Sequence, residues 1–522
     1  MRVAPWAEVL DDARRMAGGL RAARAVQPGE LVGAVLTNTP LAVRGLLALW
    51  MAGGAVASLP VPARGLQLDE YVAQVRAMCG AAQVRTLLTD ANLLALLPAK
   101  LQQELGASPW ERYLESSALV DVQPPPLDSL AFVQYSSGST STPKGCALTA
   151  RAIGAQLSII LRVSDAVPGR ETVASWLPLS HDMGLFGCLL FSWAYDLDLV
   201  LSTPERFTMA PRTWFADMAE HGATMTAGTN TGLAAAVRAR RSGLGRPLEL
   251  RTAFIGAERV EWSTLAATTA AFEDDGLQPS ALMPAYGLAE ATLAVTAKPP
   301  QERPRFLAVD TLALADGVVA QVAPAAPGAT VLTSCGIPCS GVTIDLGEGD
   351  RLSEVVVSSP SLATGYYRDP VRTAERFTSS GFRSGDLGFT HDGQLYLVGR
   401  GDDVLSVGGR KIYAREIELA VDALAPVRRG CSTVLDMHDG TATRLVLVTE
   451  LRGADPPYDA VADAAADIAT AKGGVVLHSC LFLSPGTLPK TPSGKIQRYR
   501  CRQLLLSDGL EVAARVRLGS DR

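Results

Sequence analysis

Short apolar segments alternate with longer amphipathic segments near the start of the chain, and this alternation limits the folds open to it. Apolar runs at 31–36, 55–59 and 84–88 indicate buried strands. Between them, Leu41–Ala52 and Leu68–Cys79 predict helices, the second with its apolar residues on one face. Strands that alternate with helices build mostly parallel sheets covered by helices. The sequence therefore predicts an α/β fold.

The chain is too long, at 522 residues, for one hydrophobic core, so two or three domains are expected. The proline-rich stretch 123–126 is predicted to close a first lobe, and a second α/β lobe is expected over roughly 130–300. After Gly399 and Arg400 we expect a compact α+β domain with a strand at 444–449 and a helix at 458–471. Short apolar runs predict a β-rich lobe in between, at 318–322, 331–332, 342–346, 355–357 and 395–398.

The composition argues against several classes of protein. A net charge of −5 gives no basic footprint for nucleic acid. The uncharged stretch 45–63 is long enough to span a membrane, but two glycines and two prolines interrupt it, so no membrane span is predicted. The eight cysteines include no Cys-x-x-Cys pair, which disfavours a zinc site and favours buried, reduced thiols. With no signal-peptide core at the N-terminus, we expect a cytoplasmic protein.

The segment from Tyr135 to Thr149 reads YSSGSTSTPKGCALT and is the most informative stretch for function. Hydroxyls, backbone N–H groups and one cation in a short loop suit a polyphosphate. A buried strand, Ala131–Val133, is predicted just before it. The loop is not a Walker A motif, because Gly145 rather than Ser or Thr follows Lys144. The alternative is a flexible Ser/Gly linker, but linkers rarely end in Pro-Lys-Gly and re-enter apolar sequence.

Five other segments are each weak signals, since Gly-Asp pairs and Pro/Ser/Gly loops are usually turns. Together with the loop at 135–149, and in this order, they resemble the core motifs of the adenylate-forming superfamily. That superfamily includes acyl-CoA synthetases, luciferases and peptide-synthetase adenylation domains, and the resemblance runs from about residue 6 to 510. The segments are WLPLSHDMG at 176–184, YGLAE at 286–290, SGDLG at 384–388, GRGDDVLSVGGR at 399–410 and LPKTPSGKIQR at 488–498.

Within the superfamily the chain is most similar to the fatty acyl-AMP ligases. The phrase at 176–187, the segment from Pro304 to Gly336 and the ending at 488–502 resemble that subfamily. Its members carry the extra segment, which is associated with impaired use of free coenzyme A. The resemblance implies that the acyl group of a carboxylic acid goes first to AMP and then to the phosphopantetheine arm of an acyl carrier protein.

The resemblance also implies a large N-terminal domain over 1–399, made of two α/β lobes and a β-rich lobe. A hinge at 400–403, centred on Asp402, would lead into a small mobile α+β domain over 404–522. A plain turn is the alternative for Asp402. Lys495 would reach from the small domain to the α-phosphate and the carboxylate oxygens. The alternative for Lys495 is an exposed surface lysine.

ATP and Mg²⁺ are the cofactors implied by the resemblance. Glu290 would bind Mg²⁺, which prefers one or two carboxylates with phosphate oxygens. Asp386 would accept hydrogen bonds from the ribose hydroxyls, with Arg400 as a further ribose contact. The β- and γ-phosphates would contact Ser136, Ser137, Gly138, Ser139, Thr140, Ser141, Thr142 and Lys144, and the adenine would lie among Gly256, Ala257, Glu258, Tyr286, Gly287, Leu288 and Ala289.

The acid is expected to lie near His181, Asp182 and Met183, and near Gly228, Thr229 and Asn230. His181 either gates the acyl tunnel, orients the carboxylate or is structural. Acyl-AMP ligases usually have a Pro-Asn-Phe phrase in the region where this chain has Ala227-Gly228-Thr229-Asn230-Thr231-Gly232, which is small and polar. One hypothesis is an acid shorter or more polar than a long fatty acid, and the alternative is a loop that merely repacks.

Three other functions stay open at this stage. An acyl-CoA ligase of the same fold is disfavoured by the extra segment. An amino-acid-activating enzyme usually has a Phe-Asp phrase where His181-Asp182 stands. A catalytically silent nucleotide-binding or scaffold protein is disfavoured because Lys144, Glu290, Asp386, Arg400 and Lys495 are all present. The sequence does not determine the oligomeric state.

Overall fold

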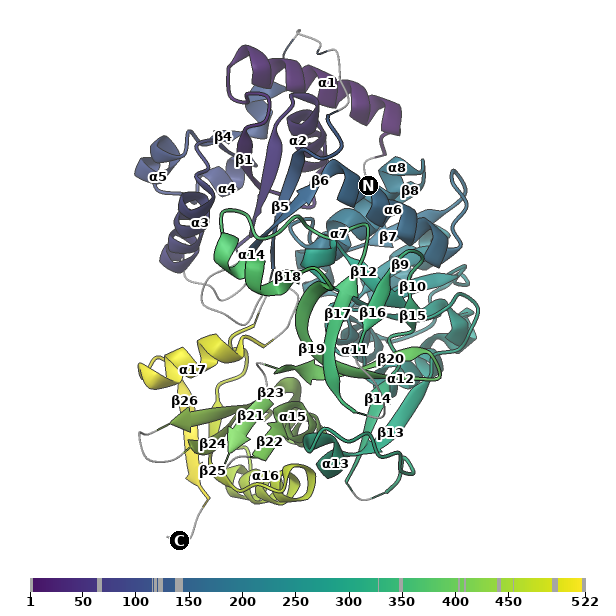
Figure 1. Ribbon diagram of the computed structural model, residues 1–522, viewed down its shortest axis with the longest axis vertical. Coiled ribbons are helices and arrows are strands. Elements are labelled where there is room, and N and C mark those ends of the chain that lie inside the picture. Colours follow the sequence, from purple (N-terminus) through teal and green to yellow (C-terminus); the bar gives the residue numbers. More distant parts are fainter. Residues whose placement is uncertain are drawn as a thin grey trace.

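The computed structural model shows two α/β lobes and a β-rich part in one large body, with a smaller body below them (Figure 1). Its described residues are 3–62, 68–114, 116, 120, 125–136, 144–326, 328–346, 351–401, 404–407, 410–438, 443–453, 455–490 and 496–518. Sequence order follows the long axis only in part, since the green segments return to the first lobe at α14 (Pro370–Arg376) (Figure 1).

The first lobe is a six-stranded sheet covered by helices, as the alternating pattern predicted. Strands β1 and β2 run parallel, with Leu31 opposite Ala55. Helix α2 begins where Thr39 caps it by accepting a hydrogen bond from the Ala42 N–H, with Pro40 in its first turn. The strand order is β4 (Ser108–Pro109), β3 (Leu87–Thr89), β1 (Leu31–Val35), β2 (Ala55–Leu59), β5 (Leu130–Ser136), β6 (Lys144–Thr149), and the helices are α1 (Trp6–Ala22), α2 (Pro40–Met51), α3 (Leu68–Ala82), α4 (Ala91–Leu94) and α5 (Ala99–Glu104).

The predicted boundary between the first two lobes is wrong in one respect. Strands β5 and β6, which flank the hydroxyl-rich loop, belong to the first sheet and not to the second lobe. Phe132 lies opposite Val56 and Val133 opposite Ala57 in a parallel pairing of β5 with β2. Phe132 and Val133 are fully buried, so their apolar run fits an inner strand of the sheet. The first lobe therefore continues beyond the proline-rich stretch 123–126.

The second lobe is a seven-stranded sheet whose inner strands are parallel. Strand β9 pairs with β10 and β10 with β11, so the carboxyl ends of these strands lie at one edge. Ligands bind at such edges in α/β proteins. The strand order is β15 (Ile337–Pro338), β12 (Ala294–Ala297), β11 (Leu282–Gly287), β10 (Thr252–Ile255), β9 (Met225–Gly228), β7 (Thr172–Ser175), β8 (Asp198–Leu201), and the helices are α6 (Ala150–Ser164), α7 (Asp182–Gly184), α8 (Phe191–Ala194), α9 (Pro204–Met209), α10 (Thr213–Glu220), α11 (Asn230–Ala239) and α12 (Trp262–Phe272).

A β-rich part follows, as predicted, with one difference. Within the described residues, the run at 318–322 forms isolated bridges and no strand, with Val318 opposite Arg351 and Gln321 opposite Val309. The SGDLG motif lies inside β19, the first strand of the β19–β20 hairpin. The strands are β16 (Thr343–Asp345), β17 (Ser353–Ser358), β18 (Phe377–Thr378), β19 (Gly381–His391) and β20 (Gln394–Arg400), and a separate pair, β13 (Phe306–Asp310) and β14 (Ala329–Thr333), flanks α13 (Thr311–Ala315).

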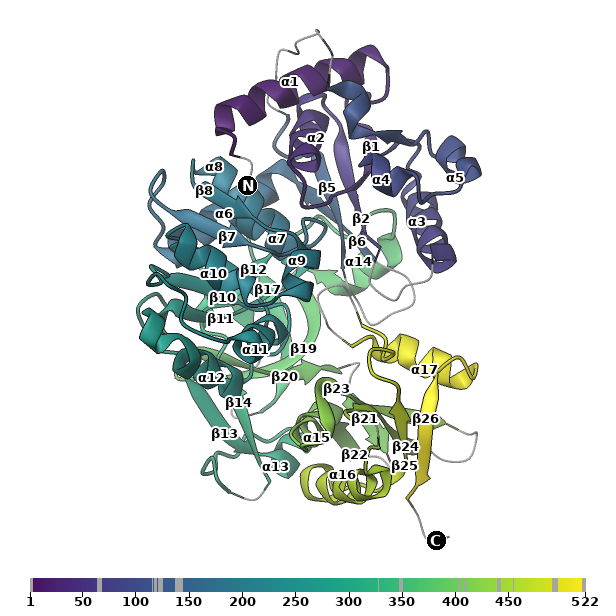
Figure 2. The same ribbon diagram turned by 180° about the vertical axis from the view of Figure 1, so that it is seen from behind.

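The residues after β20 form a small α+β body with its own core, below the large body in both views (Figure 1, Figure 2). Strand β24 pairs antiparallel with β23 and parallel with β25. The elements are β21 (Val404–Val407), β22 (Arg410–Tyr413), α15 (Ala414–Asp422), β23 (Val427–His438), β24 (Thr443–Leu451), α16 (Tyr458–Gly473), β25 (Leu477–Leu483), α17 (Arg498–Leu506) and β26 (Val512–Arg517).

All eight cysteines are buried and free, as the spacing predicted. Within the described part of the chain, no helix combines the length and apolar character needed to cross a membrane. Nor does that part contain a group of three or more His, Cys, Asp or Glu side chains that would suit a metal ion.

Candidate active site

Asp386 is the centre of the predicted ribose site, and three elements meet there. The Tyr286 hydroxyl at the end of β11 donates a 2.6 Å hydrogen bond to Asp386 Oδ2. Arg400 lies opposite Asp386 across the β19–β20 hairpin, with its Nε 3.3 Å from Oδ1. Burial, and then the carboxylate of Asp386, raise the pKa of Tyr286, so its hydroxyl stays protonated as a donor. The structure thus brings together Tyr286 and Asp386, which lie 100 positions apart in the chain, with Arg400 as the hairpin partner of Asp386.

The predicted adenine segment, Gly256–Glu258, follows β10 and lies against the end of β9. The Gly256 N–H donates to the Gly228 carbonyl at 3.1 Å. Ala257 has a φ of +63°, an uncommon conformation for a residue with a Cβ and one that gathers at binding sites. Glu258 does not point freely into the site, because its carboxylate accepts from the Thr231 N–H and from the Thr231 hydroxyl at 3.0 Å.

The predicted phosphate loop is described only at its two ends. Ser136 ends β5 and pairs with Lys144 at the start of β6. Ser137, Gly138, Ser139, Thr140, Ser141 and Thr142 lie outside the described residues. Lys144 is half-buried, and its Nζ lies 5.7 Å from the centre of the Tyr366 ring.

Glu290 lies in the turn after β11 and is buried, with 8% of its surface exposed. The Tyr366 hydroxyl donates to Glu290 Oε1 at 2.8 Å. Burial lowers the pKa of Lys144, and the carboxylate of Glu290 opposes that change. One buried carboxylate beside a lysine and a phenol fits Mg²⁺, since this ion binds one or two carboxylates and completes its shell with phosphate oxygens and water.

His181 caps the short helix α7 and faces its own neighbour. Its Nδ1 lies 2.6 Å from Asp182 Oδ1, and the Gln134 amide of β5 holds the preceding turn by donating to the Ser180 carbonyl at 3.2 Å. Burial opposes ionisation of Asp182, but His181 and the Met183 N–H together lower the pKa of its carboxyl group. About a quarter of the His181 side chain is exposed, whereas Met183 is buried.

The residues 228–231, predicted to lie near the acid and called the acyl loop here, include polar side chains that form hydrogen bonds within the protein. Thr229 caps α11 by accepting from the Gly232 N–H at 3.0 Å. Asn230 Oδ1 accepts from the Glu261 N–H at 3.0 Å, and Thr231 is held by Glu258. These contacts support the repacking interpretation of the loop, because Thr229 Oγ1, Asn230 Oδ1 and the Thr231 hydroxyl each bond to a group of the protein.

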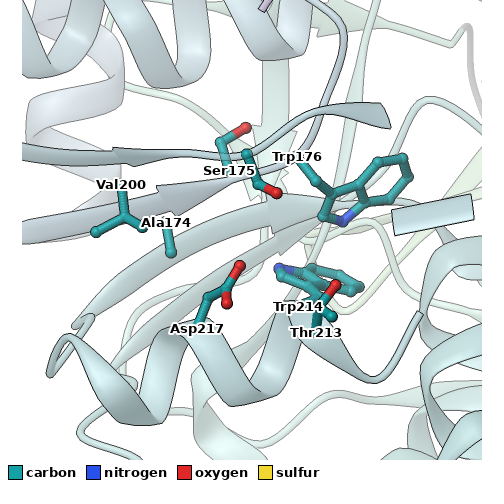
Figure 3. A pocket seen from close by; sticks show the side chains of 8 residues that line it. Ala174, Ser175, Trp176, Val200, Thr213, Trp214 and Asp217 are labelled. Carbon is teal, nitrogen blue, oxygen red and sulfur yellow. The ribbon is translucent and has the colours of Figure 1, made fainter. Parts of the chain in front are cut away.

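Aromatic side chains fill the space behind the acyl loop. A Cβ on Gly228 would lie 2.2 Å from the Trp214 ring, so the indole touches the backbone of this glycine. Trp176 stacks on Phe207 at 3.7 Å between ring centres and meets Trp214 edge-on at 5.8 Å. Figure 3 shows Trp176, Trp214 and Asp217 around a cavity of about 10 Å³, the room of roughly one water molecule.

Two predicted residues, Lys495 and Asp402, lie outside the described part of the chain. Leu288 and Ala289 lie in the turn that leads to Glu290, and Gly287 is required there because a Cβ would lie 1.9 Å from the Leu293 carbonyl oxygen. No sequence motif pointed to Tyr366 or Trp214. The only signal for Tyr366 was the doublet Tyr366-Tyr367 after a glycine, which is too common to assign a role.

Comparisons with known proteins agree with this geometry. The family described as AMP-binding enzyme matches residues 4–367. The medium-chain-fatty-acid–[acyl-carrier-protein] ligase JamA of Moorena producens is 31% identical over 504 residues, which is 90% of this chain and 84% of that protein. The long-chain-fatty-acid–AMP ligase FadD32 of Mycolicibacterium smegmatis is 28% identical and covers 76% of this chain and 72% of its own.

The fold is also similar to solved structures of this kind. A structure from a study of fatty acyl-adenylate ligases of E. coli and L. pneumophila superposes with a TM-score of 0.89 at 24% identity, over 96% of this chain and 92% of the other. The chain belongs to the AMP-binding enzymes, the adenylate-forming ligases. The two relatives described above are named as an acyl-carrier-protein ligase and an acyl-AMP ligase.

Proposed function

We propose that this protein activates a carboxylic acid with ATP and passes the acyl group to the phosphopantetheine thiol of an acyl carrier protein. In the first step a carboxylate oxygen bonds to the α-phosphorus of ATP, the bond to the bridging oxygen breaks, and pyrophosphate leaves. In the second, the thiol sulfur bonds to the acyl carbon, AMP leaves and the thiol proton passes to solvent.

The observation that carries this proposal is the meeting of Tyr286, Asp386 and Arg400 at one point. A carboxylate is an acceptor-only group with about four lone-pair sites, so Asp386 can hold Tyr286 and Arg400 and still accept from ribose hydroxyls. The neighbouring segment Gly256–Glu258 supports an adenine position beside it, since its backbone lies between the ends of β9 and β11.

The phosphate groups require cations, because two anions react with each other. Lys144 is proposed to contact the β- and γ-phosphates together with residues 136–142. Glu290 would hold Mg²⁺, which offsets phosphate charge when bound. Lys495 is proposed to contact the α-phosphate and the attacking carboxylate, as a long side chain with a compact charge can.

His181 is proposed to lie at the entrance for the acid, where its partial exposure supports contact with a bound carboxylate. Its Nδ1 pairs with Asp182, and this contact fixes the orientation of the ring at the proposed entrance.

The small domain is proposed to turn about residues 400–403 between the two steps. The proposal of a carrier protein rather than free coenzyme A as acceptor is supported by the segment 303–334, because this segment forms hydrogen bonds to the small domain. Lys472 Nζ of α16 donates to the Ala329 carbonyl at 2.7 Å, and the Thr330 hydroxyl donates to Glu416 of α15 at 2.9 Å. These contacts resist free movement of the small domain.

The acid is proposed to be shorter than a long fatty acid. The support is the contact of Trp214 with Gly228, because an indole packed against this residue would limit the depth of the acyl pocket. The polarity of Thr229 and Asn230 does not support it, since both side chains bond to the protein itself. A screen by ATP–pyrophosphate exchange over acids of four to sixteen carbons tests this length limit. Strong preference for acids of twelve to sixteen carbons would reject it.

To identify the acceptor, the enzyme with a preformed acyl-adenylate is mixed separately with three candidate acceptors. We expect thioester formation with the phosphopantetheinylated carrier protein, little with coenzyme A, and none with the carrier protein that lacks the arm. Equal or faster reaction with coenzyme A would instead identify an acyl-CoA ligase, and exchange confined to amino acids would identify an amino-acid-activating enzyme.

A further inference from the structure

Tyr366 contacts both Lys144 and Glu290, the two charged residues proposed to act on the phosphates and Mg²⁺, although it belongs to neither of their motifs. Its hydroxyl donates to Glu290 Oε1 at 2.8 Å, and its ring faces Lys144 Nζ at 5.7 Å. Only 6% of the residue is exposed. A buried side chain that contacts the proposed metal carboxylate and the proposed phosphate lysine fixes the distance between them.

The backbone around Tyr366 ties the same two elements together. The segment 363–367 adds to the edge of β6: the Tyr367 N–H donates to the Gly145 carbonyl at 2.7 Å, and the Ala147 N–H donates to the Gly365 carbonyl at 2.9 Å. At its other end the Ala363 N–H donates to the Glu290 carbonyl at 2.7 Å. Tyr366 therefore lies on a short segment that connects the β5–β6 hairpin, which flanks the predicted phosphate loop, to the turn that contains Glu290.

The opposite side of Tyr366 is held by α14, which lies beside the lower ends of β5 and β6 in both views (Figure 1, Figure 2). The Tyr366 N–H donates to the Thr373 hydroxyl at 2.9 Å, and the ring meets Phe377 edge-on at 5.5 Å. Ring and backbone are thus fixed before any ligand binds, as preorganisation of a charged site requires.

We propose that Tyr366 is the positioning residue of the metal and phosphate site. Its hydroxyl occupies Glu290 Oε1, which would leave Oε2 for Mg²⁺, and its ring supports the Lys144 ammonium. The inference rests on the proposed function, because it assigns Glu290 to Mg²⁺.

The test compares Tyr366→Phe with Tyr367→Phe, a matched loss of one hydroxyl on the next residue, whose ring faces Arg368 instead. ATP binding is measured by calorimetry over a series of Mg²⁺ concentrations, with no acid present, so that catalysis is not required. Loss of one hydrogen bond to a charged group corresponds to about a tenfold change. We expect Tyr366→Phe to raise the half-saturating Mg²⁺ concentration about tenfold and Tyr367→Phe to leave it unchanged.

Two further variants separate the outcomes. Glu290→Gln should abolish the Mg²⁺ dependence of ATP binding. Tyr366→Leu should raise the half-saturating Mg²⁺ concentration as Tyr366→Phe does, and should also weaken ATP binding without Mg²⁺, because Lys144 loses the ring that supports it. A merely structural Tyr366 would lower the melting temperature without moving the Mg²⁺ curve, and that result would overturn the inference. Unchanged Mg²⁺ dependence in Glu290→Gln would overturn it as well. Absence of exchange with every acid would count against the proposed function alone, since the binding curves do not depend on it.

Discussion

Arg259 of the large domain forms a buried ion pair with Glu416 of the small domain, directly after the segment proposed to bind adenine. Both side chains are largely buried, at 14% and 7% exposed. Burial opposes the charge, but the carboxylates of Glu416 and Glu261 raise the pKa of Arg259, which stays a cation. Arg259 also donates to the Val331 carbonyl at 3.2 Å, so the segment 303–334, the proposed adenine segment and the small domain meet at this one side chain.

Breaking this pair is expected to release the small domain. Removal of one partner of a buried ion pair costs about 3–5 kcal/mol, because the other charge stays buried. Since the pair joins two domains, Glu416→Gln should slow adenylate formation about tenfold in single-turnover measurements. Arg415→Gln is the control, because Arg415 is one-third exposed and lies 3.8 and 4.0 Å from its carboxylates. Equal effects of the two substitutions would show that the pair does not hold the domains together.

Asp386→Asn should weaken ATP binding without changing use of the acid. An amide has one acceptor oxygen, so it cannot hold Tyr286 and Arg400 and also accept from ribose. Hydrogen bonds to charged groups contribute about 1.5–3 kcal/mol, which predicts a KM for ATP raised on the order of 10- to 100-fold. The KM for the acid should stay within twofold. A rise in that value alone would place Asp386 in the acid pocket.

Trp214→Leu should admit longer acids. Shortening this side chain frees space directly behind Gly228, and each methylene that a pocket accommodates changes kcat/KM by about 10- to 200-fold. The ratio of kcat/KM for a ten-carbon acid over a four-carbon acid is expected to rise at least tenfold. Phe272→Leu, which truncates a buried aromatic stacked on Phe215 instead, controls for general loosening of the core. The same shift in both variants would contradict the assignment.

Asp422 makes stability depend on pH. It lies at the end of α15 and is buried, with Oδ2 accepting from the Gly430 N–H at 2.9 Å, and burial raises the pKa of its carboxyl group from 3.8 to about 6. Between pH 4 and pH 6 the folded protein binds more protons than the unfolded chain, so this group lowers stability as pH rises through that window. The cost is fully present above pH 6 and amounts to about 3 kcal/mol at most.

Asp422→Asn removes this titration. Its melting temperature relative to the unsubstituted protein should therefore increase from pH 4 to pH 7. Asp467→Asn, the same substitution at an exposed position of the small domain, is measured beside it. An equal rise in that variant would show that the effect does not come from Asp422. A constant difference for Asp422→Asn would mean that its carboxyl group titrates alike in both states.

The elements near the site were predictable where one local signal sufficed. Strand β2 at Ala55–Leu59 and helix α2 follow from an apolar run and from a cap beside a proline. The run at 318–322 is apolar too, but it finds no continuous partner strand, and pairing is a property of the whole sheet. The position of β5 in the first sheet depends likewise on β2, more than seventy residues earlier.

Within the site, motifs pointed to Asp386 and Glu290 but not to the groups that hold them. Tyr366 and Arg259 act through contacts across 76 and 157 positions, which no spacing rule encodes. Thr229 and Asn230 show the converse case. Their polarity suggested a ligand, whereas in the structure it satisfies a helix cap and a backbone N–H.

Lys495 of the small domain is proposed to act on the same nucleotide as the ribose- and phosphate-binding residues of the large domain. The test is ATP–pyrophosphate exchange with the best acid in Lys495→Ala. Lys490→Ala is the control, because the Lys490 ammonium contacts Cys431 Sγ at 3.1 Å instead. We predict exchange reduced on the order of 10²–10³-fold for Lys495→Ala, as for loss of one electrostatic donor, and little change for Lys490→Ala. Undiminished exchange in Lys495→Ala would contradict this proposal.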